Sequence, residues 1–193
     1  MPESSRLSWR TVALSTALAL AAATFTVVVL SDDDDAVTTG DEPAGSIELT
    51  PDEDVPSADD VSFLTFDDQE VPLTSLEGTP TVVNFFASTC TPCITEMPAF
   101  EEVHKELADE PVAFLGLAVT DRADDALALV EQTGVTYPTA QDPDASVITA
   151  LGGSVLPTTV LLGADGEILA TRHGEIDADE LRSMIAGELG ISA

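Results

Sequence analysis

Residues 81–93 read TVVNFFASTCTPC, and this stretch decides the fold class. Its first seven residues form a continuous apolar run of strand length, as expected of a central strand covered on both faces. Cys90 and Cys93 follow, and a helix is expected from about Cys90 to Ala108. Its apolar residues are spaced to line one buried side: Ile94, Met97, Phe100, Val103 and Leu107. A buried strand and a helix therefore meet at the cysteine pair.

Strand and helix patterns alternate downstream of this unit. Residues 112–119 form a second apolar strand, and Asp121 is the predicted N-cap of a helix through Gln132. A short helix is expected near 145–151. This order is typical of an α/β protein.

The C-terminal part predicts a hairpin and a last helix. Residues 158–162 and 167–171 have strand character, and the turn at 163–166 joins them. Asp177 and Glu180 form a capping box in front of the final helix.

A second hairpin is expected at the start of the folded part. Residues 61–66 and 71–73 are short strands separated by four polar residues. Together these elements predict an α/β fold with a central mixed sheet flanked by helices and an N-terminal β-hairpin extension.

The N-terminus has the pattern of a membrane anchor. Residues 11–30 carry no charge, Arg6 and Arg10 precede them, and four aspartates follow at 32–35. A helix of this length spans about 30 Å, which matches a bilayer core, and the bases place residues 1–10 in the cytoplasm. The sequence therefore predicts a single-pass signal anchor with everything after residue 31 outside the cell membrane.

A cleaved signal peptide is the alternative, because Ala19, Ala21 and Ala23 could supply a cleavage site. Retention is preferred, since residues 27–30 prolong the apolar run and cleavage would leave them in water. Both interpretations export the rest of the chain. Residues 31–60 are too polar to fold and predict an acidic tether, which leaves 61–193 as the folded domain.

The net charge of −30 comes from 36 acidic and 6 basic residues. Nucleic acid and anionic lipid headgroups bind clustered Lys or Arg. A surface this negative should therefore repel both. The charge excludes nucleic-acid binding but does not identify a function.

The two cysteines are the only ones in the chain, which excludes a disulfide framework. At the start of a helix, unpaired N–H groups and the helix dipole would stabilise Cys90 as a thiolate, the form that attacks a disulfide. Cys93, one turn deeper, is placed to resolve the mixed disulfide. Pro92 suits the first turn of a helix.

Three other interpretations compete with redox chemistry. The pair could be a structural disulfide, although so short a loop gives little stabilisation. It could be half of a zinc site completed by His104 and His173, but neither has finger spacing around it. It could also be two idle thiols. Both histidines are expected to be surface or edge residues.

Residues 83–93, the following Glu96-Met97-Pro98 and the later 155–159 segment VLPTT resemble the TlpA/ResA-like branch of the thioredoxin family. The similarity covers about residues 61–190. It implies a thioredoxin fold and a thiol–disulfide oxidoreductase with the active-site dipeptide Thr91-Pro92 and no cofactor.

The resemblance assigns roles to two further residues. Pro157 matches a proline that follows a cis peptide bond, faces the redox pair and keeps metals off the thiols, whereas spacing alone would favour a trans bond. Glu96 matches an acid beside the pair that could shuttle protons for Cys93. Without the resemblance, Glu96 would be interpreted as an exposed helix carboxylate.

Other positions concern the surroundings of the pair. Asn84 stands where ordinary thioredoxins carry a buried aspartate, and it is expected to be an interior amide. Pro98 matches a helix-kinking proline. Thr89 departs from the family, which usually has tryptophan before the first cysteine, and this puts the usual docking surface in doubt.

The resemblance further implies a reductant of extracytoplasmic protein disulfides that takes electrons from a membrane thiol carrier, with cytochrome c apoprotein as one substrate. A disulfide-forming oxidant would use the same cysteines. Peroxide reduction needs Pro-x-x-x-Thr-x-x-Cys, and Ala87 occupies the threonine position. A copper-binding metallochaperone using both thiols and a histidine is the alternative from another class.

Overall fold

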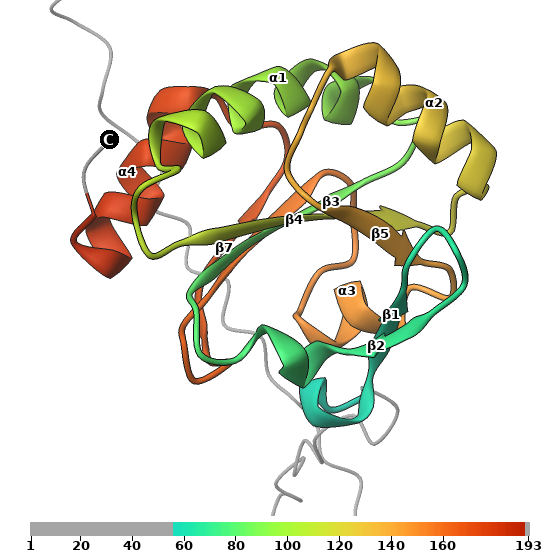
Figure 1. Cartoon of the computed structure of the whole chain (residues 1–193), viewed down its shortest axis with the longest axis horizontal. Helices are drawn as coiled ribbons and strands as arrows, with labels where there is room; N and C mark the ends of the chain where they lie inside the picture. The colour runs from blue at the N-terminus through green and yellow to red at the C-terminus, as the bar shows by residue number, and fades with distance from the viewer. Residues whose placement is uncertain (1–55, 192–193) are drawn as a thin grey trace, which may run out of the picture. The chain divides into compact units, whose positions relative to one another are not determined.

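A seven-stranded mixed sheet forms the centre of residues 56–191, which are the residues that the computed structural model describes (Figure 1). Its strands are β1 (Ser62–Leu64), β2 (Glu70–Pro72), β3 (Thr81–Phe86), β4 (Ala113–Val119), β5 (Thr139–Asp142), β6 (Thr158–Leu162) and β7 (Ile168–His173). They lie in the order β2-β1-β5-β4-β3-β6-β7. Because β3, β4 and β5 run parallel, their C-terminal ends share one edge of the sheet.

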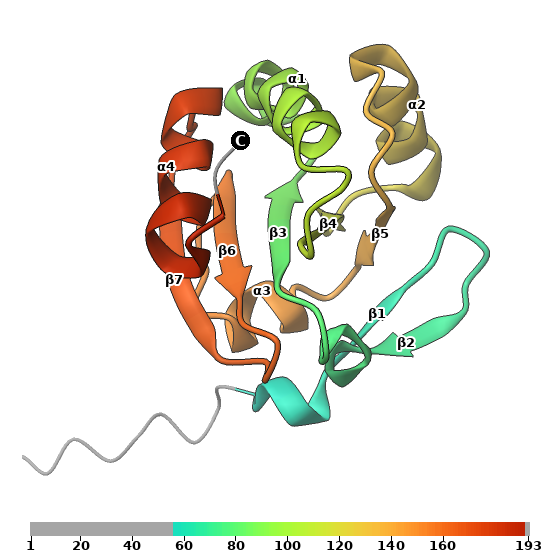
Figure 2. The same cartoon turned by 60° about the vertical axis from the view of Figure 1, so that its left-hand side comes forward.

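Helices cover both faces of this sheet. Within the described residues they are α1 (Thr91–Glu106), α2 (Ala123–Thr133), α3 (Ser146–Ala150) and α4 (Ala178–Leu189), with 3₁₀ turns η1 (Ala58–Asp60) and η2 (Leu73–Leu76). Figures 1 and 2 show α1, α2 and α4 on one face and α3 on the other. The sheet is therefore the middle of three layers.

The central strand β3 is buried along its whole length. Val82 and Phe86 face the core under α1, α2 and α4, whereas Val83 and Phe85 face the core that contains α3. Side chains two residues apart point to the same face of a strand, so Asn84, between Val82 and Phe86, lies on the α1 side.

Most of the predicted elements are confirmed. β1 and β2 form the N-terminal hairpin, and β6 and β7 form the later one. Asp177 and Glu180 form the expected capping box in front of α4. α1 begins one residue after Cys90, which is its N-cap. The mixed sheet flanked by helices with a hairpin extension is thus as predicted.

Two details differ from expectation. Asp121 does not cap α2, which begins at Ala123 with Arg122 at the N-cap and no side-chain cap bond. The Asp121 carboxylate instead accepts hydrogen bonds from Ser88, in the loop after β3. Strand β5 was not expected, because its four residues lack an apolar run, yet it pairs with both β4 and β1.

Among the described residues, none of the helices combines the length and the apolar character needed to cross a membrane. The predicted cytoplasmic segment 1–10, the predicted anchor 11–30 and the tether up to residue 55 lie outside the described residues. Those predictions remain predictions.

Candidate active site

The cysteine pair lies where β3 meets α1. After the strand ends, the backbone N–H of Cys90 donates to the Ala87 carbonyl oxygen at 3.0 Å, which closes a tight turn. Cys90 then caps α1, and its Sγ accepts from the Cys93 N–H at 3.3 Å. Cys90 Sγ thus lies at the N-terminus of α1, next to the backbone N–H groups that have no partner within the helix, as the sequence predicted.

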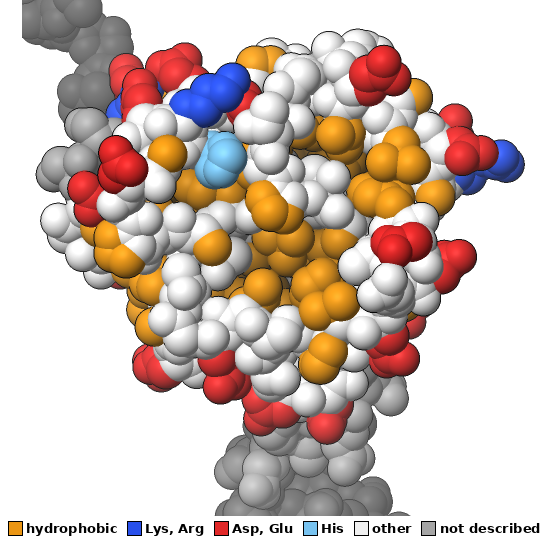
Figure 3. Space-filling view, in the orientation of Figure 1, with side chains coloured by type: hydrophobic (Ala, Val, Ile, Leu, Met, Phe, Trp, Pro, Cys, Tyr) orange, Lys and Arg blue, Asp and Glu red, His pale blue; other side chains and the backbone are white. Residues whose placement is uncertain are grey.

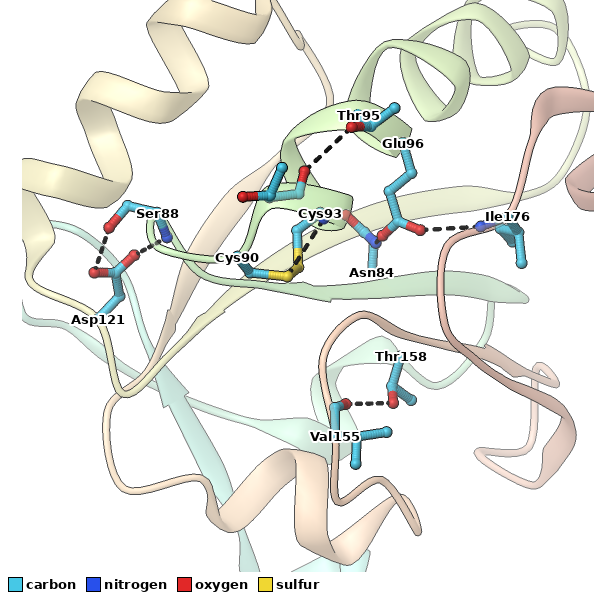
Figure 4. Close-up of a disulfide and its surroundings, with 11 residues drawn as sticks. Asn84, Ser88, Cys90, Cys93, Thr95, Glu96, Asp121, Val155, Thr158 and Ile176 are labelled. Atoms are coloured by element: carbon cyan, nitrogen blue, oxygen red, sulfur yellow. Dashed lines mark hydrogen bonds between the residues drawn. A yellow bond between two sulfur atoms is a disulfide. The ribbon is translucent and has the colours of Figure 1, made fainter.

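Cys90 and Cys93 are joined in a disulfide with an S–S distance of 2.03 Å (Figure 4). Cys90 is half-buried, whereas Cys93 is completely buried. Thr91 and Pro92, between them, are exposed. Only one sulfur of the pair is therefore open to a partner from solvent. The roles of Cys90 as nucleophile and Cys93 as resolving thiol require this accessibility, and they remain predictions.

The loop before β6 contains Pro157. The Leu156–Pro157 peptide bond is cis, the form that the family resemblance implies and that local spacing alone would not favour. Thr158 donates from its hydroxyl to the Val155 carbonyl oxygen at 2.7 Å, and Gly174 donates to the Pro157 carbonyl oxygen at 2.9 Å. In Figure 4, Val155 and Thr158 lie on the opposite side of the disulfide from α1.

Glu96 is buried beneath α1, with 1% of its surface exposed. Its Oε1 accepts from Asn84 Nδ2 at 2.7 Å, and its Oε2 accepts from the Ile176 N–H at 3.3 Å (Figure 4). The interpretation of Glu96 as an exposed helix carboxylate is therefore wrong. The acid lies inside the fold, three residues along α1 from Cys93.

Burial raises the pKa of Glu96 from 4.5 to about 7, the two hydrogen bonds oppose the rise, and the negative charge of Glu175 adds to it. A carboxyl group is harder to ionise away from water. The sequence left open whether burial or the helix N-terminus would dominate, and the structure shows that burial does. Near neutral pH Glu96 can both give and take a proton.

Asn84 is the interior amide that was expected. Besides its bond to Glu96, its Oδ1 is buried and has no hydrogen-bond partner among the described residues. Thr159 lies directly opposite Asn84 in the β3–β6 ladder, and its buried hydroxyl also has no hydrogen-bond partner among the described residues. The floor of the site under α1 is therefore polar as well as buried.

Sequence reasoning missed the contact between Ser88 and Asp121. The Ser88 hydroxyl donates to Asp121 Oδ1 at 2.9 Å, and the Ser88 N–H donates to Oδ2. The two residues are far apart in the chain, but the loops that carry them follow the neighbouring parallel strands β3 and β4. The adjacency of these two strands was the signal that could have indicated the contact between Ser88 and Asp121.

Three of the remaining positions considered in the sequence are exposed. Thr89 and Pro98 are exposed, with Pro98 inside α1. His173 is exposed on edge strand β7, as predicted, and its Nδ1 lies 3.1 Å from the Thr158 hydroxyl.

His104 is not a plain surface residue. Its ring packs edge-on against Phe114 and Tyr137, with centroid distances of 5.3 and 5.8 Å. Within residues 56–191, no group of three or more His, Cys, Asp or Glu side chains is placed to hold a metal ion.

Comparisons with known proteins place this arrangement in a family. The model of the AhpC/TSA family matches residues 52–171. A curated relative, thiol-disulfide oxidoreductase ResA of Halalkalibacterium halodurans, is 30% identical over 106 residues, which are 55% of this chain and 60% of the relative. The ResA of Bacillus anthracis is 29% identical over 61% of this chain and 68% of its own length. The chain thus spans about 60% of the length of the first of these relatives.

Solved structures share the fold. MTB dsbF, determined in mixed oxidized and reduced forms, aligns with a TM-score of 0.61 and 26% identity over 69% of this chain and 98% of its own. A thioredoxin family thiol:disulfide interchange protein from Chlorobium tepidum TLS aligns with a TM-score of 0.58 and 27% identity over 67% and 93%. The thioredoxin fold and the ResA-like relationship expected from the sequence are confirmed. Because the family match covers more than half of the chain and includes both cysteines and Pro157, this chain belongs to the AhpC/TSA family.

Proposed function

We propose that this chain is a thiol–disulfide oxidoreductase that exchanges disulfides with extracytoplasmic proteins. One observation carries the proposal: an accessible and a buried cysteine, joined in a disulfide, occupy the first turn of α1. The similarity to relatives named thiol-disulfide oxidoreductase ResA supports the same chemistry.

The mechanism follows from the two environments. In the reduced protein the Cys90 thiolate attacks a sulfur of the substrate disulfide, so that one S–S bond forms and the substrate's bond breaks, releasing a substrate thiolate. Cys93 then loses its proton and attacks Cys90 Sγ. The Cys90–Cys93 disulfide forms, and the second substrate thiolate leaves with the electron pair of the broken bond.

Glu96 is placed to serve the second step. Cys93 is buried and cannot exchange its proton freely with water, whereas Glu96 lies one turn away with its pKa raised by burial to about 7. The carboxylate takes the proton from Cys93 as it attacks and returns it when the pair is reduced again.

The proposed direction is reduction of the partner, in the manner of ResA-like proteins. A membrane thiol carrier would return the two electrons to the Cys90–Cys93 pair, and cytochrome c apoprotein is one candidate substrate. An oxidant would run the same steps in reverse. Equilibrating the pair with glutathione buffers decides the direction: a potential well below that of glutathione means a reductant, and one well above it means an oxidant.

Membrane attachment is part of the proposal. Retention through residues 11–30 would place the thioredoxin domain outside the cell membrane. Protease added to intact cells should release the domain by cutting between residues 31 and 60. Mature protein found free in the medium, with an N-terminus near residue 24, would show that the segment is a cleaved signal.

The activity itself is tested by reduction of a protein disulfide such as that of insulin. With dithiothreitol as the electron donor, the wild-type chain should turn over, and Cys90→Ser should be inactive. Cys93→Ser should accumulate a mixed disulfide through Cys90, because nothing remains to resolve it. Trapping only in Cys90→Ser would reverse the two roles.

The same preparations separate the competing classes. Hydrogen peroxide should not be consumed above background, since Ala87 stands where a peroxide-reducing site needs threonine. Titration of the reduced protein with Cu(I) tests the metallochaperone. Tight stoichiometric binding together with absent reductase activity would replace the proposal.

A further inference from the structure

Two loops at the active-site edge of the sheet are joined by one carboxylate. β3 and β4 are parallel neighbours, so the loops that follow them lie side by side. Ser88, in the first loop, donates from its N–H and its hydroxyl to the two oxygens of Asp121, in the second (Figure 4). The Asp121 carboxylate thus binds both the N–H and the hydroxyl of Ser88.

These two hydrogen bonds hold a residue of the turn that carries Cys90. Ser88 is the second residue of the tight turn closed by the bond from Cys90 N–H to the Ala87 carbonyl. Two residues of chain span at most about 7 Å, so the Asp121 carboxylate lies within roughly 10 Å of Cys90. Fixing Ser88 therefore limits where the turn can hold the reactive sulfur.

The backbone around Asp121 is shaped for this contact. Thr120 has a φ of +48°, an uncommon conformation for a β-branched residue, and its N–H donates to the Asp142 carbonyl at 3.0 Å. Asp121 Oδ1 also accepts from the Arg122 N–H at 2.9 Å. The strained turn directs the carboxylate towards Ser88, and Oδ1 also accepts from the N-cap residue of α2.

The charge of Asp121 has no cationic partner in the described part of the chain. Arg122, the nearest candidate in sequence, pairs with Asp125 at 3.3 Å. Only neutral N–H and O–H donors face the Asp121 oxygens. A negative charge at this distance in a partly solvated site disfavours a second negative charge on sulfur.

We propose that Asp121 is a positioning residue for disulfide exchange: through Ser88 it holds the turn that presents Cys90, and its charge opposes formation of the Cys90 thiolate. The inference rests on the proposed function, because it takes Cys90 as the attacking thiol. It adds a second influence on Cys90 that counteracts the helix N-terminus and limits the thiolate population.

Four variants of the full-length chain, in mild detergent, separate the two roles of Asp121. Asp121→Asn keeps an acceptor for Ser88 and removes the charge, whereas Asp121→Ala removes both. Ser88→Ala loses the hydroxyl bond and keeps the charge. Asp124→Asn is the matched control, because it makes the same charge change on the first turn of α2 and has no hydrogen bond to the Cys90 loop.

The first measurement, on the reduced protein, is the rate of Cys90 alkylation by iodoacetamide against pH, with the product located by mass spectrometry. The variants leave unchanged the other charged or titratable groups on the elements next to the pair: Cys93 and Glu96 on α1, Arg122 and Asp125 at the start of α2, and His173 and Glu175 at and after the end of β7. Asp121→Asn should move the midpoint about half a pH unit lower, as removal of a unit charge at this distance predicts. Ser88→Ala should leave it unchanged.

The second measurement is the rate of insulin reduction, divided by the thiolate fraction from the first. This corrected rate should fall several-fold in Asp121→Ala, less in Ser88→Ala, and not in Asp121→Asn or Asp124→Asn. The reduction potential of Asp121→Asn should rise, because a stabilised thiolate favours the reduced form. Thermal unfolding confirms that each variant is folded.

The outcomes are distinguishable. A midpoint shift in Asp121→Asn no larger than that in Asp124→Asn overturns the effect of charge. An unchanged corrected rate in Asp121→Ala overturns the positioning role. If the wild-type chain reduces no protein disulfide, the proposed function fails, whereas the alkylation profiles still report whether Asp121 opposes the Cys90 thiolate.

Discussion

Glu96 shows how far the fold can move the chemistry of one residue. On α1 alone it would be a solvated carboxylate near a helix N-terminus, with a low pKa. The segment that leads into α4 covers it, and Ile176 supplies one of its two hydrogen bonds. Burial then raises its pKa to about 7, which suits the acid to the proposed role of proton carrier.

Replacement of Glu96 by glutamine tests this role. The amide keeps the shape and can still pair with Asn84, but it cannot titrate. Insulin reduction should slow about 100-fold at pH 7, at the lower end of the range typical of general acid–base groups, and its inflection near pH 7 should disappear. Equal rates in the variant and the wild type from about pH 5 to 9 would mean that Cys93 finds its protons elsewhere.

The same residue predicts how stability depends on pH. A carboxyl group whose pKa is raised in the folded state binds its proton more tightly there, so the folded protein loses stability as pH rises from about 4.5 to about 7. For Glu96 alone the loss is about 3 kcal/mol. The free energy of unfolding of Glu96→Gln relative to wild type should therefore increase across this window and level off above it.

Urea unfolding at several pH values, with the disulfide intact, measures that difference. Taking the difference between the two proteins removes the contributions of other carboxyl groups, such as the buried Asp142, whose pKa is also raised by burial. A difference that stays flat between pH 4.5 and 7 would contradict the raised pKa of Glu96.

At the scale of elements, α4 is fastened to α1 by one arginine. Arg182 on α4 donates from Nε and Nη2 to the two oxygens of Glu106 at 2.8 Å, and from Nη2 to Glu102, both on α1. Its Nη1 reaches Asp179 on its own helix at 2.8 Å. α4 follows the segment that covers Glu96, so this clamp joins two helices that lie next to that residue.

Arg182→Gln should loosen that contact. It removes a bidentate pair and leaves three carboxylates close together, so the melting temperature should fall by roughly 3–6 °C in a domain of this size. Arg172→Gln is the control, because it removes the same charge from exposed β7, where the arginine bonds only to the Thr171 carbonyl. Equal losses in both variants would mean that overall charge, and not the clamp, is responsible.

Elements with a strong local pattern were predictable from the sequence. β3 and α1 follow from apolar spacing, and the start of α4 follows from its capping box. β5 was not predictable, because its residues Thr-Ala-Gln-Asp become a strand only through pairing with β4 and β1. Asp121 had the position of an N-cap, but the neighbouring loop offered it two donors at once.

The site divides in the same way. Cys90 and Cys93 were found from spacing within the chain, and the cis bond before Pro157 followed from the family resemblance. The burial of Glu96 depends on a segment 80 residues away in sequence. Contacts of that kind leave no local pattern, so the sequence could name the residue but not its pKa.

At the scale of the whole molecule, charge is the dominant feature. Residues 61–193 contain 23 acidic and four basic residues, and Figure 3 shows acidic side chains around the rim of a face whose centre is hydrophobic. Three of the four bases form ion pairs: Lys105, Arg122 and Arg182. Nearly all remaining carboxylates therefore repel one another in the folded state.

Salt should consequently stabilise this protein. The Debye length shortens from about 10 Å at 0.1 M to about 3 Å at 1 M ionic strength, so repulsion between exposed carboxylates is screened. Screening also weakens the exposed pairs of Arg182, but these attractions are few beside the excess of acids. We expect the urea midpoint to rise between 0.1 and 1 M NaCl, and the loss caused by Arg182→Gln to shrink over the same range.

Choline chloride at equal ionic strength should give the same rise, because screening depends on ionic strength and not on a bound cation. A midpoint that falls with salt would mean that the few ion pairs outweigh the repulsion.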